Sequence, residues 1–269
     1  MLLGLELGKI IEIIPETDKT PKVAGLIYSG VHTIYDLVID SLERLFFFDG
    51  SYTLRMITYN STRTEEISTG EFWDNGKQIR INNEGTRLLF RKSDKVLLEF
   101  KVDEERVTPT RGIRLEEGNI ADFIYSPDGK FVFIMTDDGM LRFRSKNIDK
   151  DYVIDSKGQY FCLSVSNCGK YLAVSSNHSD GNITEHGIFI FELQGTKDPI
   201  FLHKVAFLTD FPQDWLRQLH FDIQTHGENV LAACTTTSCM LVTFMLKNKK
   251  LEQFQRELSL NDDPDSRLG

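Results

Sequence analysis

The chain has 269 residues, of which 41% are hydrophobic and 26% are charged, as in ordinary globular proteins. Its net charge of −9 disfavours broad, unspecific binding to nucleic acid or to an anionic membrane, because phosphate surfaces attract basic proteins. No run approaches the roughly 18 consecutive apolar residues of a membrane-spanning helix, and the start MLLGLELGKIIEII lacks the basic region and cleavage site of a signal peptide. We therefore expect an intracellular protein, in cytoplasm or nucleus, without a membrane partner.

Strand-like runs separated by turns follow one another along the whole chain. The first part, residues 1–29, reads as a strand, a turn, a second strand and then a third strand, KVAGLIYS. Five units of four strand-like runs each follow, and their first runs are IYDLVI (34–39), QIRI (78–81), IADFIYS (120–126), YFCLSVS (160–166) and LRQLHFDI (216–223). Apolar runs rich in Phe, Ile and Val, divided by polar turns, predict antiparallel hairpins in series.

The units recur at a nearly constant interval. Their first turns carry the anchor residues Ser41, Asn82, Ser126, Ser166 and Gln224, which are 41, 44, 40 and 58 residues apart. The last interval is long because the polar stretches NHSDGNITEH and LTDFPQD lengthen the loops. In the clearest copy, YSPDGKFVF, Asp128 and Gly129 supply the residue types that tight turns favour.

A four-strand unit that recurs every 40 to 45 residues predicts an all-β fold, a β-propeller of four-stranded antiparallel blades. Runs such as LFFF are apolar at consecutive positions, as expected for strands covered on both faces. A β-sandwich is the alternative, but its turns need not keep a period. We expect one propeller domain over residues 1–258 and a polar tail over residues 259–269.

The number of blades is left open between six and seven. The chain shows five complete units and three quarters of another, whose first strand is missing before Met1. In a six-bladed ring a short strand from beyond Leu258, where only LSL looks able to pair, would close the first blade. In a seven-bladed protein an N-terminal part would be absent from this chain.

The stretches YSPDGKFVFIMTDDGMLRFR and SVSNCGKYLAVSS resemble the WD40-repeat propellers in their order of turns and strands. The signature Gly-His pair before the first strand is missing, and RFRS, FEL and EFKV stand where Trp-Asp would end the third strand. The resemblance implies a non-catalytic scaffold or adaptor that holds other proteins of a multi-subunit complex, without cofactor, metal or catalytic residue.

The last two units also resemble the lactonase-type propellers, through VSNCGKYLAVSSNHSDGNITEHGIFIFEL and the unit that follows it. This second resemblance implies a hydrolase whose site uses histidine and charged side chains at the central opening. The corresponding candidates here lie in the stretch NHSDGNITEHG and are Asn177, His178, Asp180, Glu185 and His186. Imidazole and carboxylate groups suit a metal or acid–base site, but a solvated insertion is the simpler interpretation.

Three aromatic residues are the candidates for partner binding. Trp73 precedes the first strand of one unit, and Phe211 and Trp215 precede the first strand of another, within LTDFPQDW. In a propeller the connections from one blade to the next emerge on a single face, and large aromatic residues are enriched at binding hot spots. The alternative interpretation is that these side chains fill gaps between blades.

A basic cluster within one unit is the candidate for binding an acidic partner or nucleic acid phosphates. It comprises Arg80, Arg87, Arg91, Lys92 and Lys95. A solvated blade edge, kept charged to discourage edge pairing, is the competing interpretation. Because of the acidic total, nucleic acid is not the expected direct partner.

Overall fold

The computed structural model describes residues 2–4, 8–14, 22–40, 42–51, 53–58, 64–67, 78–82, 84–103, 106–144, 149–153, 158–166, 168–179, 184–194, 201–208, 216–222, 229–235, 240–247 and 250–259. These residues form strands and turns, without a helix among them. The chain divides into two compact units, Met1–Glu117 and Gly118–Gly269.

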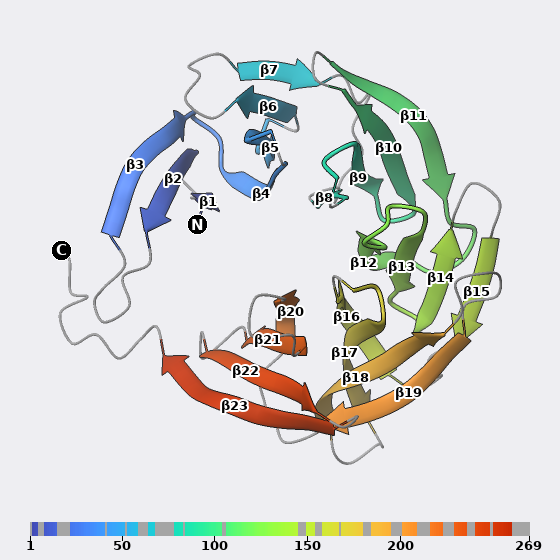
Figure 1. Ribbon diagram of the computed structural model, residues 1–269. Helices are drawn as coiled ribbons and strands as arrows, with labels where there is room; N and C mark the ends of the chain where they lie inside the picture. Colours follow the sequence, from blue (N-terminus) through green and yellow to red (C-terminus); the bar gives the residue numbers. More distant parts are fainter. Residues whose placement is uncertain are drawn as a thin grey trace. The chain divides into compact units, whose positions relative to one another are not determined.

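The first unit contains three antiparallel sheets in which the strands pair in chain order (Figure 1). The first sheet has three strands, β1 (Leu2–Gly4), β2 (Lys9–Ile14) and β3 (Lys22–Ser29). The second has four, β4 (Ile34–Ile39), β5 (Arg44–Asp49), β6 (Leu54–Thr58) and β7 (Thr64–Ile67). The third also has four, β8 (Ile79–Ile81), β9 (Arg87–Ser93), β10 (Val96–Val102) and β11 (Val107–Arg114).

The second unit contains three further four-stranded sheets with the same pairing order. The first is formed by β12 (Ile120–Tyr125), β13 (Val132–Thr136), β14 (Met140–Arg144) and β15 (Asp149–Val153). The second is formed by β16 (Gly158–Val165), β17 (Tyr171–Ser179), β18 (Thr184–Gln194) and β19 (Phe201–Leu208). The third is formed by β20 (Leu216–Asp222), β21 (Asn229–Thr235), β22 (Met240–Lys247) and β23 (Lys250–Ser259).

The described residues therefore form five four-stranded sheets and one three-stranded sheet, which confirms the predicted units and the partial unit at the start. Of the segment LSL, which the six-bladed alternative uses to close the first sheet, Leu258 and Ser259 belong to β23 and lie opposite Leu241 and Met240 of β22. These two residues complete the last sheet instead.

The first turns of the sheets share one hydrogen-bonding arrangement. The buried side chains of Asn82, Ser126 and Ser166 accept backbone N–H groups from the start of the next strand, at 2.8 to 3.0 Å. Three residues after each anchor stands a glycine with φ between 66° and 70°. In the β4–β5 turn the anchor is Asp40, the neighbour of the predicted Ser41, and Asp40 Oδ1 accepts the N–H of Arg44 at 2.8 Å.

The strand RLFFFD (β5) is buried at every position because sheets pack against both of its faces. Phe46 and Phe48 belong to a cluster with residues of β8, β9 and β10, whereas Leu45 and Phe47 belong to a cluster with Ile10 of β2. Successive side chains of a strand point to opposite faces, so an uninterrupted apolar run covers both neighbours. This confirms the interpretation of the LFFF run.

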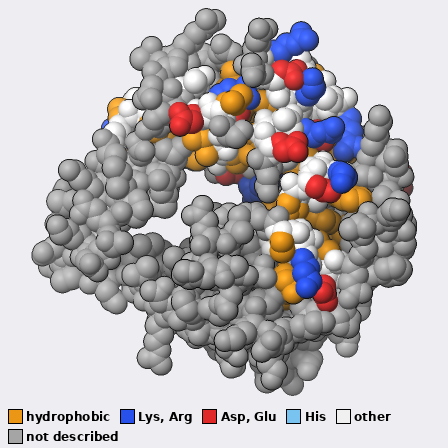
Figure 2. Space-filling view, viewed as in Figure 1, with side chains coloured by type: hydrophobic (Ala, Val, Ile, Leu, Met, Phe, Trp, Pro, Cys, Tyr) orange, Lys and Arg blue, Asp and Glu red, His pale blue; other side chains and the backbone are white. Residues whose placement is uncertain are grey.

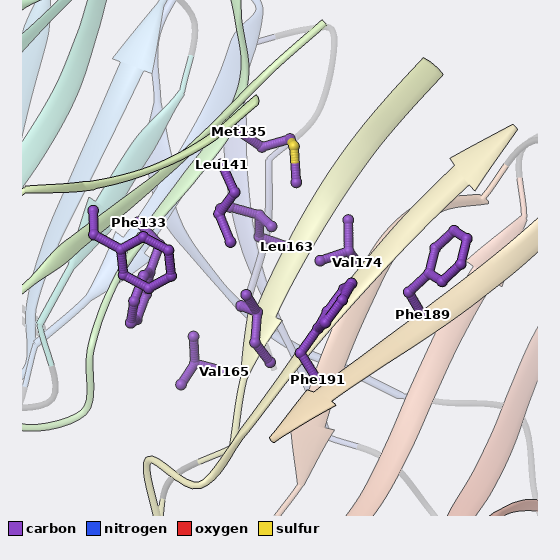
Figure 3. Close-up of a cluster of buried hydrophobic side chains, with 10 residues drawn as sticks. Phe133, Met135, Leu141, Leu163, Val165, Val174, Phe189 and Phe191 are labelled. Atoms are coloured by element: carbon purple, nitrogen blue, oxygen red, sulfur yellow. The ribbon is translucent and has the colours of Figure 1, made fainter. Parts of the chain in front are cut away.

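In the second unit the same packing joins the sheet β12–β15 to the sheet β16–β19. Figure 3 shows side chains from both sheets gathered in one cluster, which includes Phe133, Leu163, Val174 and Phe191. Alternate residues of each strand enter the cluster, and the rings of Phe133 and Phe143 meet edge to face with centroids 4.9 Å apart. Each Å² of apolar surface buried on folding contributes about 25 cal/mol of free energy, so such clusters are the main source of stability.

Candidate partner-binding surface

We use the term inner strands for the first strands of the four-stranded sheets, β4, β8, β12, β16 and β20. In the first unit β4 lies beside β8, and in the second unit β16 lies beside both β12 and β20 (Figure 1). In four of these strands the pairing with the second strand of the sheet shifts its register at one point. The shift follows Ile34 in β4, Ile120 in β12, Tyr160 in β16 and Leu216 in β20, so these four residues can be taken as equivalent positions. Positions in different inner strands can therefore be compared residue by residue.

An aspartate at the irregularity links neighbouring inner strands. In the first unit, Asp36 Oδ1 accepts the N–H of Leu37 and Asp36 Oδ2 accepts the N–H of Ile79 in β8, both at 2.9 Å. In the second unit, Asp122 makes the same two contacts, with Phe123 at 2.9 Å and with Leu163 of β16 at 2.8 Å. The aspartate thus satisfies one backbone donor in its own sheet and one in the next.

Arg80 Nη1 also contacts Asp36 Oδ2, at 3.1 Å. Burial of the carboxyl group raises the pKa of Asp36 above its ordinary value, and the attraction of Arg80 only partly offsets this effect. The Asp36 side chain is nevertheless 26% exposed, which is more than its buried counterpart Asp122. The surroundings of β4 are therefore more open than those of β12.

The opening lies on the face of β4 that points toward the three-stranded sheet. Ile34 and Leu37 pack in the cluster that contains Ile10 of β2, whereas Val38 packs in the cluster that contains Ile79 of β8. Because side chains alternate along a strand, Ile39 shares the face of Leu37. Ile39 is 46% exposed, and Leu37 is only half-buried. Apolar surface is thus left uncovered beside the incomplete sheet.

The inner strands β16 and β8 bury the corresponding positions, and each follows a four-stranded sheet. Leu163 and Val165 of β16, which correspond to Leu37 and Ile39, are buried in the cluster with residues of the preceding sheet. Ile79 of β8 is likewise fully buried in a cluster with residues of the sheet β4–β7. The exposure of Ile39 therefore coincides with a preceding sheet in which the described residues form three strands.

Further exposed apolar side chains stand near β4 in the sequence. Among the described residues, Val31 in the β3–β4 connection is 88% exposed, and Tyr35 and Leu42 are exposed as well. The sequence did not indicate that these residues are exposed, because an apolar residue in a strand-like run looks the same whether its side chain is exposed or buried.

The aromatic residues that the sequence predicted for partner binding, Trp73, Phe211 and Trp215, lie outside the described residues. In the sequence, Trp73 falls between β7 and β8, and Phe211 and Trp215 fall between β19 and β20. Their role in partner binding stays a prediction.

The basic cluster falls within the single sheet β8–β11, as predicted, but its charges are dispersed and mostly paired. Arg80 contacts Asp36 at 3.1 Å, Arg87 contacts Glu99 at 3.4 Å, and Arg91 contacts Asp94 at 2.8 Å. Lys92 lies near the end of β9, and Lys95 Nζ donates to the carbonyl of Glu116 at 3.3 Å. On the face that Figure 2 shows, blue and red side chains are interspersed over the described residues.

The stretch that carries the candidate histidines is part of a longer hairpin than the sequence indicated. Strand β17 continues to Ser179 and β18 begins at Thr184, so that His178 lies opposite Glu185 and His186 lies opposite Asn177. The two histidines thus occupy neighbouring register positions of one ladder. Asp180 lies outside the described residues, and the side chains that the structure describes include no group of three His, Cys, Asp or Glu suited to a metal ion.

The described part of the chain also contains no helix that is long and apolar enough to cross a bilayer. No family model matches the sequence, and no curated protein matches it.

Solved structures do match. The β-propeller domain of Cps50 (Swd1) from Myceliophteria thermophila superimposes with a TM-score of 0.69 at 14% identity, over 96% of this chain and 82% of that one. A protein from Lactobacillus plantarum gives a TM-score of 0.73 at 12% identity, over 95% of this chain and 81% of that one. At these identities the likeness concerns the fold. Together with the repeated four-stranded sheets, it shows that this chain has a β-propeller fold.

Proposed function

We propose that this protein is a non-catalytic, WD40-like propeller that acts as a scaffold or adaptor in a multi-subunit intracellular complex. The observation that carries the proposal is the exposed apolar surface at β4, where Val31, Ile39 and Leu42 are 88%, 46% and 50% exposed. Large apolar side chains left exposed in and beside one strand are candidate contacts for a protein partner. The likeness to the propeller domain of Cps50 (Swd1) supports the β-propeller fold on which this function would rest.

A second part of the proposal concerns the connections that precede β8 and β20. Phe211 and Trp215, with Trp73, would anchor the partner because aromatic side chains contribute large contact areas. Their position between β19 and β20, and between β7 and β8, is compatible with surface connections.

Affinity purification with quantitative mass spectrometry tests the scaffold function. The wild type should recover a reproducible set of proteins, and the double variant Phe211→Ala/Trp215→Ala should lose at least one of them. Ser126→Ala, which alters a turn hydrogen bond within one sheet, serves as the control and should recover the full set. Unchanged recovery with the double variant would remove these aromatics from the proposal, and recovery of no specific protein by the wild type would contradict the scaffold function.

The alternative function is a lactonase-like hydrolase with a site at the central opening. It would use His178, His186 and neighbouring carboxylates. The register of β17 and β18 sets His178 opposite Glu185 and His186 opposite Asn177. Hydrolysis of a lactone panel by the wild type that is lost in His178→Ala/His186→Ala would favour the hydrolase and count against the scaffold.

A further inference from the structure

We propose that the turn between β4 and β5 presents Leu42 and Glu43 to a partner protein that has an apolar pocket with a basic side chain at its rim. We call Asp40, Leu42 and Glu43, which lie between these two strands, the contact turn. This inference rests on the proposed scaffold function and names one contact surface and the chemistry of the protein that fits it.

The contact turn has equivalents between the first and second strands of three other sheets. In all four turns, the residue three positions after the anchor donates its N–H to the carbonyl of the anchor. The distance is 3.1 Å for Glu43 and Asp40, and it is 2.8 to 2.9 Å for the pairs Gly85–Asn82, Gly129–Ser126 and Gly169–Ser166. The four turns can therefore be compared position by position, with the anchor as the first position.

Leu42 is the first departure from the common turn. The third position is exposed in all four turns, and the other turns place Glu84, Asp128 and Cys168 there. The backbone arrangement thus forms without an apolar residue at this position. The Leu42 side chain is nevertheless 50% exposed, and Ile39, the last residue of β4, is 46% exposed just before the turn. Neighbouring exposed apolar side chains are typical of a surface that binds another protein.

Glu43 is the second departure. Its φ of 59° lies in the left-handed region, and among the described residues it is the only residue other than glycine with a positive φ. A side chain with a Cβ atom disfavours this conformation, and residues held in such conformations are concentrated at functional sites. Glycine would suit the backbone better, as it does at Gly85 and Gly129. An exposed carboxylate at this position therefore indicates a role outside the fold.

The contact turn is held in place by buried polar contacts. Asp40 Oδ1 accepts the N–H of Leu42 at 2.9 Å and the N–H of Arg44 at 2.8 Å. Asp40 Oδ2 and Arg44 Nε form an ion pair at 2.7 Å, and both side chains are buried. Arg44 Nη1 also donates to the carbonyl of Asp103, which follows β10 in the next sheet. A turn that is ordered before binding loses little conformational entropy in a complex.

The two exposed side chains define the chemistry of the partner. They stand at the end of a hairpin, whereas sites for small molecules are concave, and the carboxylate of Glu43 disfavours an anionic membrane. Burial of Leu42 needs an apolar pocket, and Glu43 beside it needs a lysine or arginine for charge complementarity. A protein with such a pocket is therefore the occupant that we propose.

The first experiment identifies the partner with the full chain. Affinity purification with quantitative mass spectrometry compares the wild type with Leu42→Ala/Glu43→Gly, and Glu84→Ala at the equivalent position of the β8–β9 turn is the matched control. The double variant should lose at least one protein that the wild type and the control recover. That protein is then purified, and its affinity for the wild type is measured by calorimetry. Unchanged recovery by the double variant, or a lost protein that does not bind the purified wild type, would overturn the proposal.

Single variants test the predicted chemistry against the purified partner. Leu42→Ala should weaken binding about tenfold, because the side chain that fills the pocket is shortened. Glu43→Gln keeps the size of the side chain but removes its charge, so it should weaken binding about threefold and make the association rate less dependent on salt. Glu84→Ala should leave the affinity unchanged. Equal affinities for Leu42→Ala and Glu84→Ala would contradict the proposal.

Glu43→Gly separates a binding role from a structural one. It relieves the left-handed backbone, so it should raise the temperature of unfolding, but it should weaken binding about fivefold because the carboxylate is lost. A turn with a purely structural role would gain stability without any loss of affinity. Because the variant is expected to be more stable than the wild type, weaker binding cannot be attributed to unfolding. An unchanged affinity would overturn the role of Glu43.

Two further outcomes separate this inference from its alternatives. Light scattering should give the mass of one chain, whereas a dimer that dissociates in Leu42→Ala would assign the contact turn to a second copy and overturn the proposal. Partners that are lost with Phe211→Ala/Trp215→Ala but kept with Leu42→Ala/Glu43→Gly would retain the scaffold function and reject only this inference. Recovery of no specific protein by the wild type would reject both.

Discussion

The carboxylate of Asp122 in β12 accepts the backbone N–H of Leu163 in β16 at 2.8 Å, and so links the inner strands of two adjacent sheets. Its other oxygen accepts the N–H of Phe123 at 2.9 Å. The residue is buried, so removal of the carboxylate would leave two buried donors without this acceptor. An unsatisfied buried donor costs about 1 to 3 kcal/mol.

We expect Asp122→Ala to lower the free energy of unfolding by about 3 kcal/mol, measured by urea denaturation. Asp36→Ala removes the equivalent link to Ile79, but its side chain is partly exposed and water can replace some of the contacts. Its cost should therefore be smaller. An equal or larger loss for Asp36→Ala would contradict the argument that burial sets the cost.

Two aspartates of the first unit should respond to pH in opposite directions. Burial of Asp49 tends to raise its pKa, but hydrogen bonds from Ser51 and from Arg55 Nε, at 2.7 Å, outweigh burial and hold the pKa below its ordinary value. The stabilisation by Asp49 is therefore complete above about pH 4, the ordinary aspartate value, and is lost as the pH falls through the lowered pKa. For Asp36 the pKa is raised, so its favourable contribution is present at low pH and is lost as the pH rises through the raised pKa.

We therefore expect Asp49→Asn to destabilise the protein more at pH 7 than at pH 3, and Asp36→Asn to do the reverse. Urea denaturation at both pH values measures the two differences, and each variant serves as the control for the other. If both variants were destabilised more at the same pH, the assigned directions of the two pKa shifts would be refuted.

The backbone of Glu43 in the β4–β5 turn has φ of 59°, the left-handed region that glycine occupies at the same place in three other turns, as Gly85, Gly129 and Gly169. A residue with a Cβ atom pays about 1 to 2 kcal/mol for this conformation. Part of the gain from glycine is offset by its greater freedom in the unfolded chain. Glu43→Gly should therefore stabilise the protein by about 0.5 to 1 kcal/mol, measured by thermal unfolding.

Two controls separate this effect from the loss of the glutamate side chain, which is exposed. Glu43→Ala keeps the Cβ atom and should change the unfolding free energy little. Gly129→Ala places a Cβ atom at φ of 66° and should destabilise the protein. Stabilisation by alanine as large as that by glycine would show that the side chain, and not the backbone conformation, is responsible.

The turns explain why so much of the fold could be predicted from the sequence. Asn82, Ser126 and Ser166 anchor turns through local side-chain hydrogen bonds, so residue type and spacing alone indicate them. Long-range pairing left no such signal. Ser179 and Thr184 extend β17 and β18 although neighbouring polar residues suggested a loop, because a backbone ladder does not depend on side-chain polarity. The exposure of Ile39 depends on how far the neighbouring three-stranded sheet covers it, and the residues of β4 alone do not indicate this.

The last prediction concerns Glu99 of β10, whose buried side chain lies between two arginines. Arg111 Nε contacts one oxygen at 2.8 Å, whereas Arg87 Nη1 contacts the other at 3.4 Å from a side chain that is 50% exposed. An exposed, long ion pair contributes between about 0 and 1 kcal/mol, but the loss of a close partner from a buried carboxylate costs considerably more. We expect Arg111→Ala to lower the free energy of unfolding by about 2 kcal/mol and Arg87→Ala by about 0.5 kcal/mol or less.

The double variant Arg111→Ala/Glu99→Gln isolates the charge of Glu99 in this comparison. Arg111→Ala leaves the buried charge of Glu99 poorly paired, and the double variant removes that charge. The double variant should therefore be more stable than Arg111→Ala in urea denaturation. The hydroxyl of Thr110 lies 2.9 Å from the Glu99 carbonyl oxygen and 3.3 Å from Glu99 Oε2. A double variant less stable than Arg111→Ala would mean that the partners left after the loss of Arg111, Arg87 and Thr110 among them, compensate the buried carboxylate. Arg87 would then contribute to stability, and a nucleic acid binding test that replaces it would have to be corrected for unfolding.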